Sequence, residues 1–286
     1  MLELTIDPPI PFLVPSTPEV TIAILGCGGT GSHIAQTLAR LASHCRDTNG
    51  PYVQLVFVDG DTVEAKNVGR QLFSALDVGK NKAQVLASRF SAVFGLSIVA
   101  FPHMLEAHTR IANPGGYGIL VGAVDSASGR RAIAYQLGTY GWKAWIDCGN
   151  HESSGQIVCG NTQSLDGMRQ AIALGMCSKL PSAPLIYPEL LKDAPVRPRE
   201  DCAALVADNA QSLMVNQMMA GVAGQYISDL VIRRRLTRFR TVVDLDSLTM
   251  RSDPITARAL AEACGVSTDH ILGVKTTRMK KARKAA

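Results

Sequence analysis

The sequence lacks the features that mark membrane-spanning, secreted and zinc-scaffolded proteins. Its 286 residues contain no run of 18 or more apolar positions, so no helix is expected to cross a membrane. The first 18 residues hold five prolines and no basic stretch before an apolar run, which argues against a signal peptide. The seven cysteines include no C-x-x-C pair, so neither a disulfide scaffold nor the usual four-cysteine zinc site is expected. We expect a cytoplasmic protein with free thiols.

The surplus of positive charge is confined to the C-terminal end. The formal net charge is +5, yet six of the 29 basic residues lie in the last twelve positions, which contain no acid. The rest of the chain is nearly neutral, and its composition is that of a globular protein. A tail of this kind is more typical of a solvated terminus than of a nucleic-acid-binding surface, so nucleic acid is not expected as a partner.

Apolar, β-branched runs alternate with amphipathic stretches along the first half of the chain. This alternation predicts an α/β fold, a Rossmann-like, doubly wound and mostly parallel sheet with helices on both faces. Right-handed crossovers would bring the carboxyl ends of the strands to one edge, together with the functional site. Strands are predicted at 20–25, 53–58, 97–101, 119–124, 143–147, 155–159 and 241–245, and helices at 32–44, 80–94, 103–112, 129–137 and 203–236.

A glycine-rich loop joins the first predicted strand to the first predicted helix. In this G-x-G-x-x-G pattern Gly26 allows a tight turn, Gly28 lets the backbone approach a phosphate, and Gly31 lets the helix pack on the strand. The start of the helix offers free N–H groups to an anion. The pattern predicts a nucleotide site, with a turn that serves packing alone as the alternative. Asp59, at the end of the second strand, could bind ribose in a dehydrogenase as well.

The residues after Asp59 favour a triphosphate over a dinucleotide. Arg70 and Lys82 are expected at the same edge as the glycine loop, and two cations beside a helix N-terminus suit a triphosphate better than a pyrophosphate. Asp125 ends a further strand and is placed to hold Mg²⁺ against the phosphates. The simpler alternatives are a surface ion pair for Arg70, a solvated helix face for Lys82 and a helix cap for Asp125.

Together these motifs resemble those of the ThiF/MoeB/E1-like superfamily, the activating enzymes of ubiquitin-like proteins. The resemblance rests on G-x-G-G-x-G-S, D-x-D-x-V-E-x-x-N-x-x-R-Q, G-x-x-K-A and V-D-S over residues 20–150, and extends more weakly to about 235. The short chain and the segment Arg-Glu-Asp-Cys-Ala-Ala are most similar to the ThiF family protein of PRTRC systems. The resemblance implies an extended arm at 1–18, an ATP-binding adenylation domain at 19–250 with a crossover loop at about 161–202, and a C-terminal extension with the basic tail at 251–286.

The resemblance also implies an activity and its ligands. The protein would be an E1-like adenylyltransferase that uses ATP and Mg²⁺ to activate the C-terminal carboxylate of a small ubiquitin-like or sulfur-carrier protein ending in glycine. A homodimer and an E2-like carrier are the further partners that it implies. Asp59 would bind the ribose, Arg70 and Lys82 would contact the phosphates with Gln71 supporting Arg70, and Asp125 would bind Mg²⁺. The full set of implied nucleotide-binding residues is Gly26, Gly28, Gly29, Gly31, Asp59, Asp61, Asn67, Arg70, Gln71, Lys82 and Asp125.

Cys202 resembles the cysteine that accepts the activated carboxyl group in ThiF-like relatives. It precedes the long predicted helix at 203–236, and the positive end of a helix dipole favours the thiolate. A small buried helix-capping residue is the alternative. Cys27, Cys148 and Cys159 are expected to pack inward, because they lie in the glycine loop and in predicted strands.

The chain departs from the pattern of its relatives in one respect that affects activity. Relatives usually carry an N-terminal arginine that reaches an ATP phosphate, often across a dimer, whereas here no Lys or Arg precedes Arg40. This absence supports a catalytically inactive ATP- or partner-binding scaffold as an alternative function. A nicotinamide-dependent Rossmann oxidoreductase and an enzyme that adenylates a small molecule or tRNA are further alternatives.

The arm at 1–18 combines prolines with apolar side chains. Ile10, Phe12, Leu13 and Val14 lie between prolines that stiffen the backbone. An extended apolar segment tends to dock on a groove or on a dimer mate instead of remaining in water. We therefore expect the arm to contribute to stability or to assembly.

Overall fold

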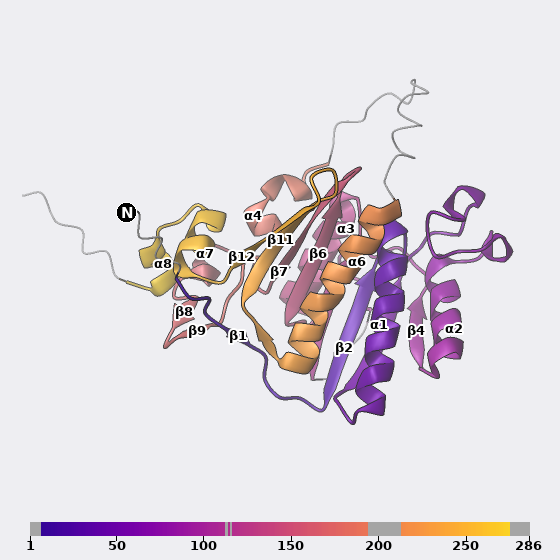
Figure 1. The fold of residues 1–286 in the computed structure, drawn as a ribbon, viewed down its shortest axis with the longest axis horizontal. Coiled ribbons are helices and arrows are strands. Elements are labelled where there is room, and N and C mark those ends of the chain that lie inside the picture. Colours follow the sequence, from indigo (N-terminus) through magenta and orange to yellow (C-terminus); the bar gives the residue numbers. More distant parts are fainter. Residues whose placement is uncertain (1–6, 112–113, 115, 194–212, 275–286) are drawn as a thin grey trace, which may run out of the picture.

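An eight-stranded sheet forms the centre of the protein (Figure 1). The computed structural model describes residues 7–111, 114, 116–193 and 213–274, and within them the strands follow the order β12-β11-β7-β6-β5-β2-β3-β4 across the sheet. The strands are β2 (Glu19–Leu25), β3 (Tyr52–Val58), β4 (Ile98–Phe101), β5 (Tyr117–Gly122), β6 (Ala144–Asn150), β7 (Ser154–Gly160), β11 (Arg238–Asp244) and β12 (Thr249–Pro254).

The five strands from β4 to β6 are parallel. β2 lies in their middle, and from Val20 to Leu25 each of its residues is at most 3% exposed. A continuous apolar sequence is what a strand needs when helices cover both of its faces. In the register, Ile22 of β2 lies between Leu55 of β3 and Ile119 of β5, so large aliphatic side chains meet across neighbouring strands. The predicted Rossmann-like, mostly parallel sheet is confirmed.

The other part of the sheet is antiparallel, which the sequence pattern did not predict. β7 pairs antiparallel with β6 and with β11, and β11 pairs antiparallel with β12. Only three residues separate Asn150 of β6 from Ser154 of β7. A parallel return needs a crossover of a dozen or more residues, so this short connection imposes the antiparallel pairing.

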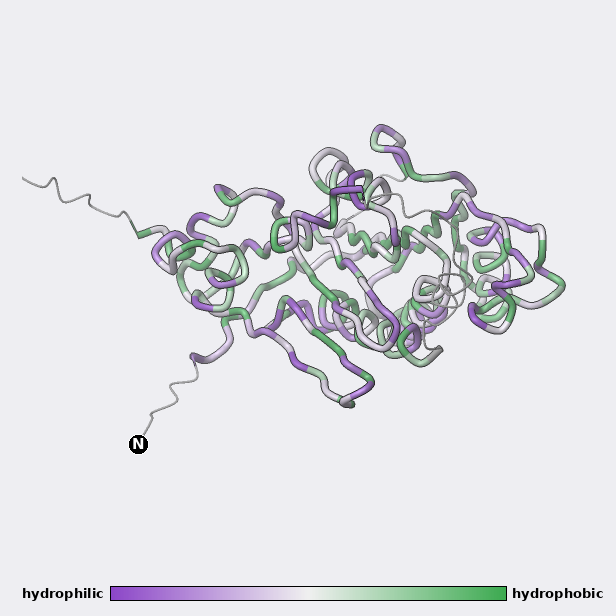
Figure 2. Tube along the Cα trace, turned by 90° about the horizontal axis from the view of Figure 1, so that it is seen from above, coloured by the Kyte–Doolittle hydropathy of each residue, from purple (hydrophilic) through white to green (hydrophobic). Residues whose placement is uncertain are grey.

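Helices cover the two faces of the sheet unequally (Figure 1). Helices α1 (Gly29–Asp47), α2 (Lys82–Phe94) and α6 (Leu213–Ser228) lie on one face over the larger core, and α3 (Ala127–Thr139) lies on the other. The smaller core includes Ile133 of α3 packed with Trp145 of β6. Figure 2 shows green, hydrophobic stretches alternating with purple, hydrophilic ones along the chain. The sheet therefore separates two apolar layers, and its carboxyl edge remains open to polar residues.

A second, four-stranded sheet of order β10-β1-β9-β8 lies beside the first and was not predicted. The arm supplies β1, which pairs antiparallel with β10 and parallel with β9. The backbone N–H of Ile10 also donates to the carbonyl of Ile255, and Phe12 and Val14 are buried. The arm thus docks on its own chain.

The remaining elements are β1 (Phe12–Leu13), β8 (Ile172–Ala173), β9 (Met176–Cys177), β10 (Arg235–Leu236), α4 (Ala183–Ile186), α7 (Ala257–Cys264), α8 (Thr268–Leu272), the 3₁₀ turns Ala65–Asn67, Ala75–Asp77, Asp166–Met168 and Pro188–Leu191, and a π-helical turn at Asp229–Arg233.

Two predicted helices differ from the structure. The predicted helix at 103–112 is absent from its described part, 103–111, which forms an irregular segment. The long predicted helix ends at the π-helical turn, Asp229–Arg233, because Arg234 adopts a left-handed conformation and the chain enters β10. Residues 203–212 of that prediction lie outside the described residues.

The division of the chain into arm, adenylation domain and extension stays a prediction. No helix within the described ranges is long and apolar enough to span a bilayer.

Removal of residues 2–15 is expected to lower the stability of the protein. The truncation deletes β1, the strand that lies between β9 and β10, together with the buried side chains of Phe12 and Val14. Each such side chain contributes about 1.5–3 kcal/mol when it is buried. Thermal melting and gel filtration measure the effect, and deletion of residues 2–6 is the control that keeps β1. Equal melting and elution of the truncated and full chains would show that the arm contributes to neither stability nor assembly.

Candidate active site

The glycine loop packs so tightly that two of its glycines cannot be replaced without moving the backbone. A Cβ atom on Gly31 would lie 1.9 Å from the carbonyl oxygen of Gly26. Gly26 has a φ of +92°, and a Cβ there would lie 2.5 Å from the carbonyl oxygen of Ala123. At Gly28, by contrast, the nearest atom would be Nε2 of Gln71, at 3.9 Å. Gly26 and Gly31 therefore serve the packing of the loop, whereas Gly28 has room on its surface.

The start of α1 is arranged to receive an anion. Its N-cap is Gly28, which supplies no side-chain hydrogen bond, and its first turn contains no acid. The first N–H groups of a helix lack partners within the helix and carry partial positive charge. These N–H groups follow β2 at the carboxyl edge of the sheet, where a phosphate or carboxylate is stabilised best.

Asp59 ties this loop to the next strand. Its Oδ2 accepts a hydrogen bond of 2.6 Å from the backbone N–H of Cys27, and its Oδ1 accepts one of 2.8 Å from the N–H of Asp61. Each carboxylate oxygen keeps a free lone pair, which could accept a ribose hydroxyl. Burial raises the pKa of Asp59, while the two backbone donors oppose the rise. Asp59 thus holds the loop backbone and retains the ability to bind a sugar.

Lys82 lies at the same edge and is almost fully buried. Its Nζ donates to Oδ2 of Asp61 at 3.0 Å, and Asp61 is the more exposed of the two. Asn81 caps the start of α2, where its side chain accepts from the N–H of Gln84 and donates to the carbonyls of Asp59 and Asp61. The end of β3 is thereby bonded to the start of α2. Lys82 is a buried cation that Asp61 compensates, which argues against a solvated helix face.

The turn from Glu64 to Leu72 contains Asn67, Arg70 and Gln71, and Nε2 of Gln71 is the atom of this turn that comes near Gly28 of the glycine loop. Oδ1 of Asn67 accepts from the N–H of Glu64 at 2.8 Å, and its carbonyl accepts from the N–H groups of Arg70 and Gln71. The N–H of Leu72 donates to Oγ of Ser32 in α1, which anchors the turn. Oε1 of Gln71 is buried, and no described residue donates to it. A buried acceptor without a donor is unusual in a folded protein.

Asp125 lies three residues beyond Gly122, the last residue of β5, and is exposed. Ser126, and not Asp125, caps α3, since its Oγ accepts from the N–H of Gly129. Among the described residues no group of three or more His, Cys, Asp or Glu side chains could hold a metal. A single free carboxylate is nevertheless the donor set that suits Mg²⁺ when phosphates and water supply the remaining oxygens. The residues at this edge therefore fit both ATP and Mg²⁺.

A buried ion pair supports the turn that carries Asp125. Arg130 of α3 and Asp147 of β6 lie 3.3 Å apart, and both side chains are less than 10% exposed. Burial raises the pKa of Asp147 to about 6, although the Arg130 guanidinium opposes the rise. Arg130 also donates to the carbonyl of Asp125 at 3.4 Å. The pair thus connects α3 and β6 behind the turn.

The three cysteines that were predicted to pack inward do so in the structure. Cys27, Cys148 and Cys159 are buried, and burial raises the pKa of each thiol. Cys202, the predicted acceptor, lies outside the described residues, so its role stays a prediction.

Three polar residues at this edge were not predicted from the sequence. Thr30 in the first turn of α1, Asn150 at the end of β6 and Asn216 in α6 hydrogen-bond to one another. Thr30 lies inside the glycine loop and could have been noticed there. The other two are 66 residues apart in sequence and carry no motif.

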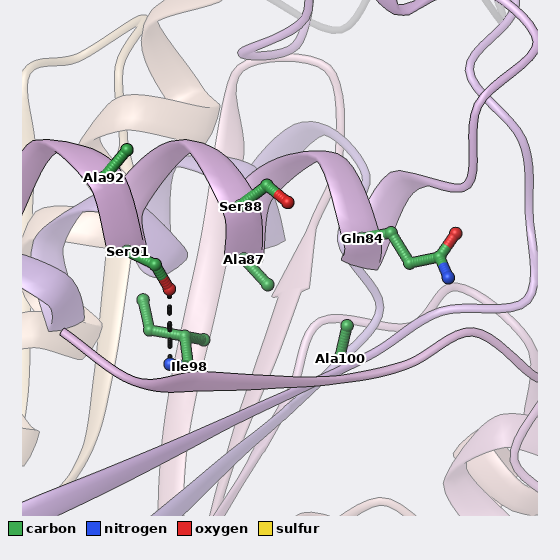
Figure 3. A pocket seen from close by; sticks show the side chains of 7 residues that line it. All are labelled: Gln84, Ala87, Ser88, Ser91, Ala92, Ile98 and Ala100. Atoms are coloured by element: carbon green, nitrogen blue, oxygen red, sulfur yellow. Dashed lines mark hydrogen bonds between the residues drawn. The ribbon is translucent and has the colours of Figure 1, made fainter.

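One cavity, of about 680 Å³, does not belong to this site (Figure 3). It lies between α2 and β4 and is lined mainly by small or aliphatic side chains, with Ser91 Oγ accepting from the N–H of Ile98. It contains no ionisable side chain. Its lining offers no charged group for a phosphate or a metal, so we place the site at the glycine loop.

Comparisons with known proteins give a family match and a set of similar folds. The sequence model of the ThiF family matches residues 17–266. No curated protein matches the chain. Among solved structures, MccB of E. coli is 18% identical, with a TM-score of 0.55 over 82% of this chain and 62% of that chain. PaaA is 17% identical, with a TM-score of 0.56 over 82% of this chain and 73% of that chain.

MccB has also been solved with ligands. The complexes with ATP and with N-formylated MccA are each 17% identical to this chain, with TM-scores of 0.53 over 82% of this chain and 64% of that chain. This chain spans less than two thirds of the length of MccB. At these identities the structural likeness establishes the fold.

Substitutions of Gly31 and Gly28 should separate packing from ligand binding. Gly31→Ala is expected to lower the free energy of unfolding by about 3 kcal/mol, because the new methyl group would overlap a backbone oxygen. Gly28→Ala should leave stability nearly unchanged but weaken nucleotide binding, because its methyl group enters the space in front of the α1 N-terminus. Urea unfolding and nucleotide titration measure the two effects. A Gly31→Ala protein as stable as the wild type would contradict the tight packing of the loop.

Proposed function

The chain belongs to the ThiF family, and from this membership we propose that it catalyses the ATP-dependent adenylation of a carboxylate. The observation that carries the proposal is the convergence of four groups at the carboxyl edge of the sheet. These are the free N–H groups of α1, the loop-bound carboxylate of Asp59, the buried cation of Lys82 and the exposed carboxylate of Asp125. The edge thus offers a ribose acceptor, two sources of positive charge and a metal ligand.

The proposed reaction joins the substrate carboxylate to the α-phosphorus of ATP. A carboxylate oxygen attacks that phosphorus, the bond to the oxygen that bridges to the β-phosphate breaks, and pyrophosphate leaves. Negative charge gathers on the phosphate oxygens, where Arg70, Lys82 and the N–H groups of α1 stabilise it. Asp125 would hold Mg²⁺, which would supply further positive charge. The attacking carboxylate is already ionised at about pH 7, so no general base is required.

The substrate we propose is the C-terminal carboxylate of a small ubiquitin-like or sulfur-carrier protein that ends in glycine. The solved complexes of MccB with ATP and with N-formylated MccA support a second ligand besides ATP for this kind of fold. The homodimer, the E2-like carrier and the assignment to PRTRC systems belong to the same proposal. Gel filtration with light scattering tests the dimer, and a pull-down with a trapped adenylate identifies the substrate.

A catalytically inactive scaffold is the second candidate, and one observation favours it. No Lys or Arg precedes Arg40, so the arm lacks the arginine expected to reach an ATP phosphate. ATP–pyrophosphate exchange distinguishes the two candidates. Exchange that depends on a peptide ending in glycine supports adenylation, whereas ATP binding without exchange supports the scaffold. Turnover of reduced nicotinamide would instead favour an oxidoreductase.

Asp125→Ala should abolish ATP–pyrophosphate exchange and leave the fold intact. Asp125 is exposed and no described residue hydrogen-bonds to its carboxylate, so its loss should change the free energy of unfolding by about 0.5 kcal/mol or less. Exchange should fail because Mg²⁺ loses its protein ligand. Asp166→Ala, at an exposed aspartate in a distant 3₁₀ turn, is the matched control. A folded Asp125→Ala protein with near-normal exchange would refute the metal assignment.

The connection of Cys202 to the described structure supports its proposed role as acceptor. Nine residues earlier, Asp193 pairs with Arg131 of α3 at 3.0 Å, and eleven residues later α6 begins beside the first turn of α1. Both attachments lie near the carboxyl edge, and an extended chain reaches about 3.3–3.6 Å per residue. We propose that the thiolate of Cys202 attacks the adenylated carbonyl carbon, so that AMP leaves and a thioester forms.

Cys202→Ala should preserve ATP–pyrophosphate exchange and abolish the reducible, thioester-linked adduct with the substrate protein. Adenylation precedes the attack of the thiolate and does not use it. Cys264→Ala is the matched control, since Cys264 is the one described cysteine that is not fully buried. A reducible adduct in the Cys202→Ala protein would rule out this acceptor.

A further inference from the structure

The turn between β5 and α3 is fixed on both sides of Asp125. Before it, the backbone N–H of Ala123 donates to the carbonyl of Leu25 at 2.8 Å, which joins the turn to the end of β2. After it, Oγ of Ser126 accepts from the N–H of Gly129 at 3.1 Å and caps α3. No described residue hydrogen-bonds to the carboxylate of Asp125. The direction of that carboxylate therefore depends on the backbone of Asp125 itself.

Arg130 of α3 bonds to that backbone. Its Nη1 donates to the carbonyl oxygen of Asp125 at 3.4 Å, and its own backbone N–H donates to the carbonyl of Ser126 at 3.2 Å. Each residue has only two backbone bonds that turn easily. A donor on the carbonyl of Asp125 opposes rotation about one of them, the Cα–C bond. Arg130 thus limits the directions in which the carboxylate of Asp125 can point.

Asp147 of β6 holds the side chain of Arg130 in place. Nε of Arg130 lies 3.3 Å from Oδ1 of Asp147, and the two side chains are 8% and 2% exposed. Gly122 at the end of β5 leaves room for the pair, because a Cβ atom there would lie 3.4 Å from the same carboxylate oxygen. Separation of the pair would leave two buried charges uncompensated, so neither side chain turns readily away from the other. The guanidinium is therefore fixed between α3, β6 and the turn.

The ion pair also explains why the carboxylate of Asp125 remains available to a ligand. An arginine this close to the turn could pair with Asp125 directly, and its charge would then oppose a divalent cation. Instead, Nε bonds to Asp147 and Nη1 bonds to a carbonyl, and the pair of Arg130 and Asp147 carries no net charge. The arrangement orients Asp125 without neutralising it. Residues that hold a metal ligand in this way commonly set the affinity of the site for its metal.

We propose that Arg130, held by Asp147, is a positioning residue that orients the carboxylate of Asp125 toward Mg²⁺. Arg130 would touch neither the metal nor the nucleotide and would act through Asp125. The inference rests on the proposed adenylation, because it concerns the metal that this reaction would use. It follows that a change at Arg130 weakens the contribution of the metal to binding and leaves binding of the nucleotide alone unchanged.

Arg130→Lys tests the positioning while it keeps the buried positive charge. An ammonium can still pair with Asp147, but it lacks the planar guanidinium that bonds to Asp147 and to the carbonyl of Asp125 together. Calorimetric titration compares the affinity for a non-hydrolysable ATP analogue in Mg²⁺ with the affinity in EDTA. Mg²⁺ should strengthen binding about tenfold or more in the wild type and about twofold or less in Arg130→Lys, with equal affinities in EDTA. An equal gain from Mg²⁺ in the two proteins would overturn the proposal.

Arg131→Lys is the matched control. Arg131 is the next residue of the same helix, and it also donates to a backbone carbonyl, that of Leu191, and to a carboxylate, that of Asp193. The substitution therefore makes the same chemical change without touching the bond to Asp125. The gain from Mg²⁺ should equal that of the wild type. A loss as large as that of Arg130→Lys would show a general effect on α3 and refute the specific role of Arg130.

Two further variants test whether Arg130 acts through Asp125. Asp147→Asn keeps an oxygen that accepts from Arg130 but removes the charge that holds the guanidinium, so the gain from Mg²⁺ should fall. This variant decides the question if Arg130→Lys does not fold, and a full gain from Mg²⁺ in it would contradict the proposal. In Asp125→Ala the gain should already be lost, and the addition of Arg130→Lys should change it no further. Additive losses would show that Arg130 does not act through Asp125.

Pyrophosphate exchange separates this inference from the proposed function, because the titrations require no turnover. In exchange, Arg130→Lys should raise the Mg²⁺ concentration for half-maximal rate about tenfold and leave the rate at saturating Mg²⁺ nearly unchanged. If the wild type exchanges and Arg130→Lys needs no more Mg²⁺ than it does, adenylation stands and the inference fails. If the titrations give the expected losses but the wild type shows no exchange, the positioning stands and the adenylation proposal fails. A wild type that gains nothing from Mg²⁺ would refute the inference.

Discussion

The site depends on the two backbone hydrogen bonds that Asp59 accepts. One comes from Cys27 in the glycine loop and the other from Asp61, whose carbonyl is in turn bonded to Asn81 and Lys82 at the start of α2. A single carboxylate at the end of β3 thereby sets the positions of the loop after β2 and of the helix that carries the buried cation. Because charge-assisted hydrogen bonds are short and strong, this arrangement holds the loop N–H groups before any ligand arrives.

The buried polar groups around this carboxylate are paired with one another. Lys82 pairs with Asp61, Arg130 pairs with Asp147, and Asn216 is bound by Thr30 and Asn150. A buried charge or amide without such partners would lower the free energy of unfolding by several kcal/mol, which is comparable to the whole stability of a domain. Each set joins two or three elements at the carboxyl edge, so the constraint that keeps polar groups satisfied also keeps the edge rigid. The α1 N–H groups, Oε1 of Gln71 and the carboxylate of Asp125 have no side-chain partner among the described residues.

Local sequence patterns were sufficient where the physical cause was local. The apolar run at 20–25 predicts a central strand because a strand covered on both faces must be apolar throughout. Gly26 and Gly31 predict the tight loop because side chains there would meet the backbone. The motif residues Asp59, Lys82 and Asp125 were placed at one edge because the carboxyl ends of parallel strands share an edge. The helix predicted at 103–112 is absent from its described part. Leu105 and Ile111 of this segment pack against the smaller core, so burial of these side chains outweighs the helical periodicity of the sequence.

The sequence alone determined the fold class and the family membership, because a strand–glycine loop–helix unit and its motif residues are contiguous segments whose chemistry depends on close spacing. Tertiary structure decided the pairing of β1 with β9 and β10, the antiparallel half of the sheet and the triad of Thr30, Asn150 and Asn216. Those contacts join segments that are far apart in sequence, and each residue in them is ordinary by itself. A hydrogen bond between such residues has no sequence pattern, because its geometry exists only after the sheet has brought the segments together.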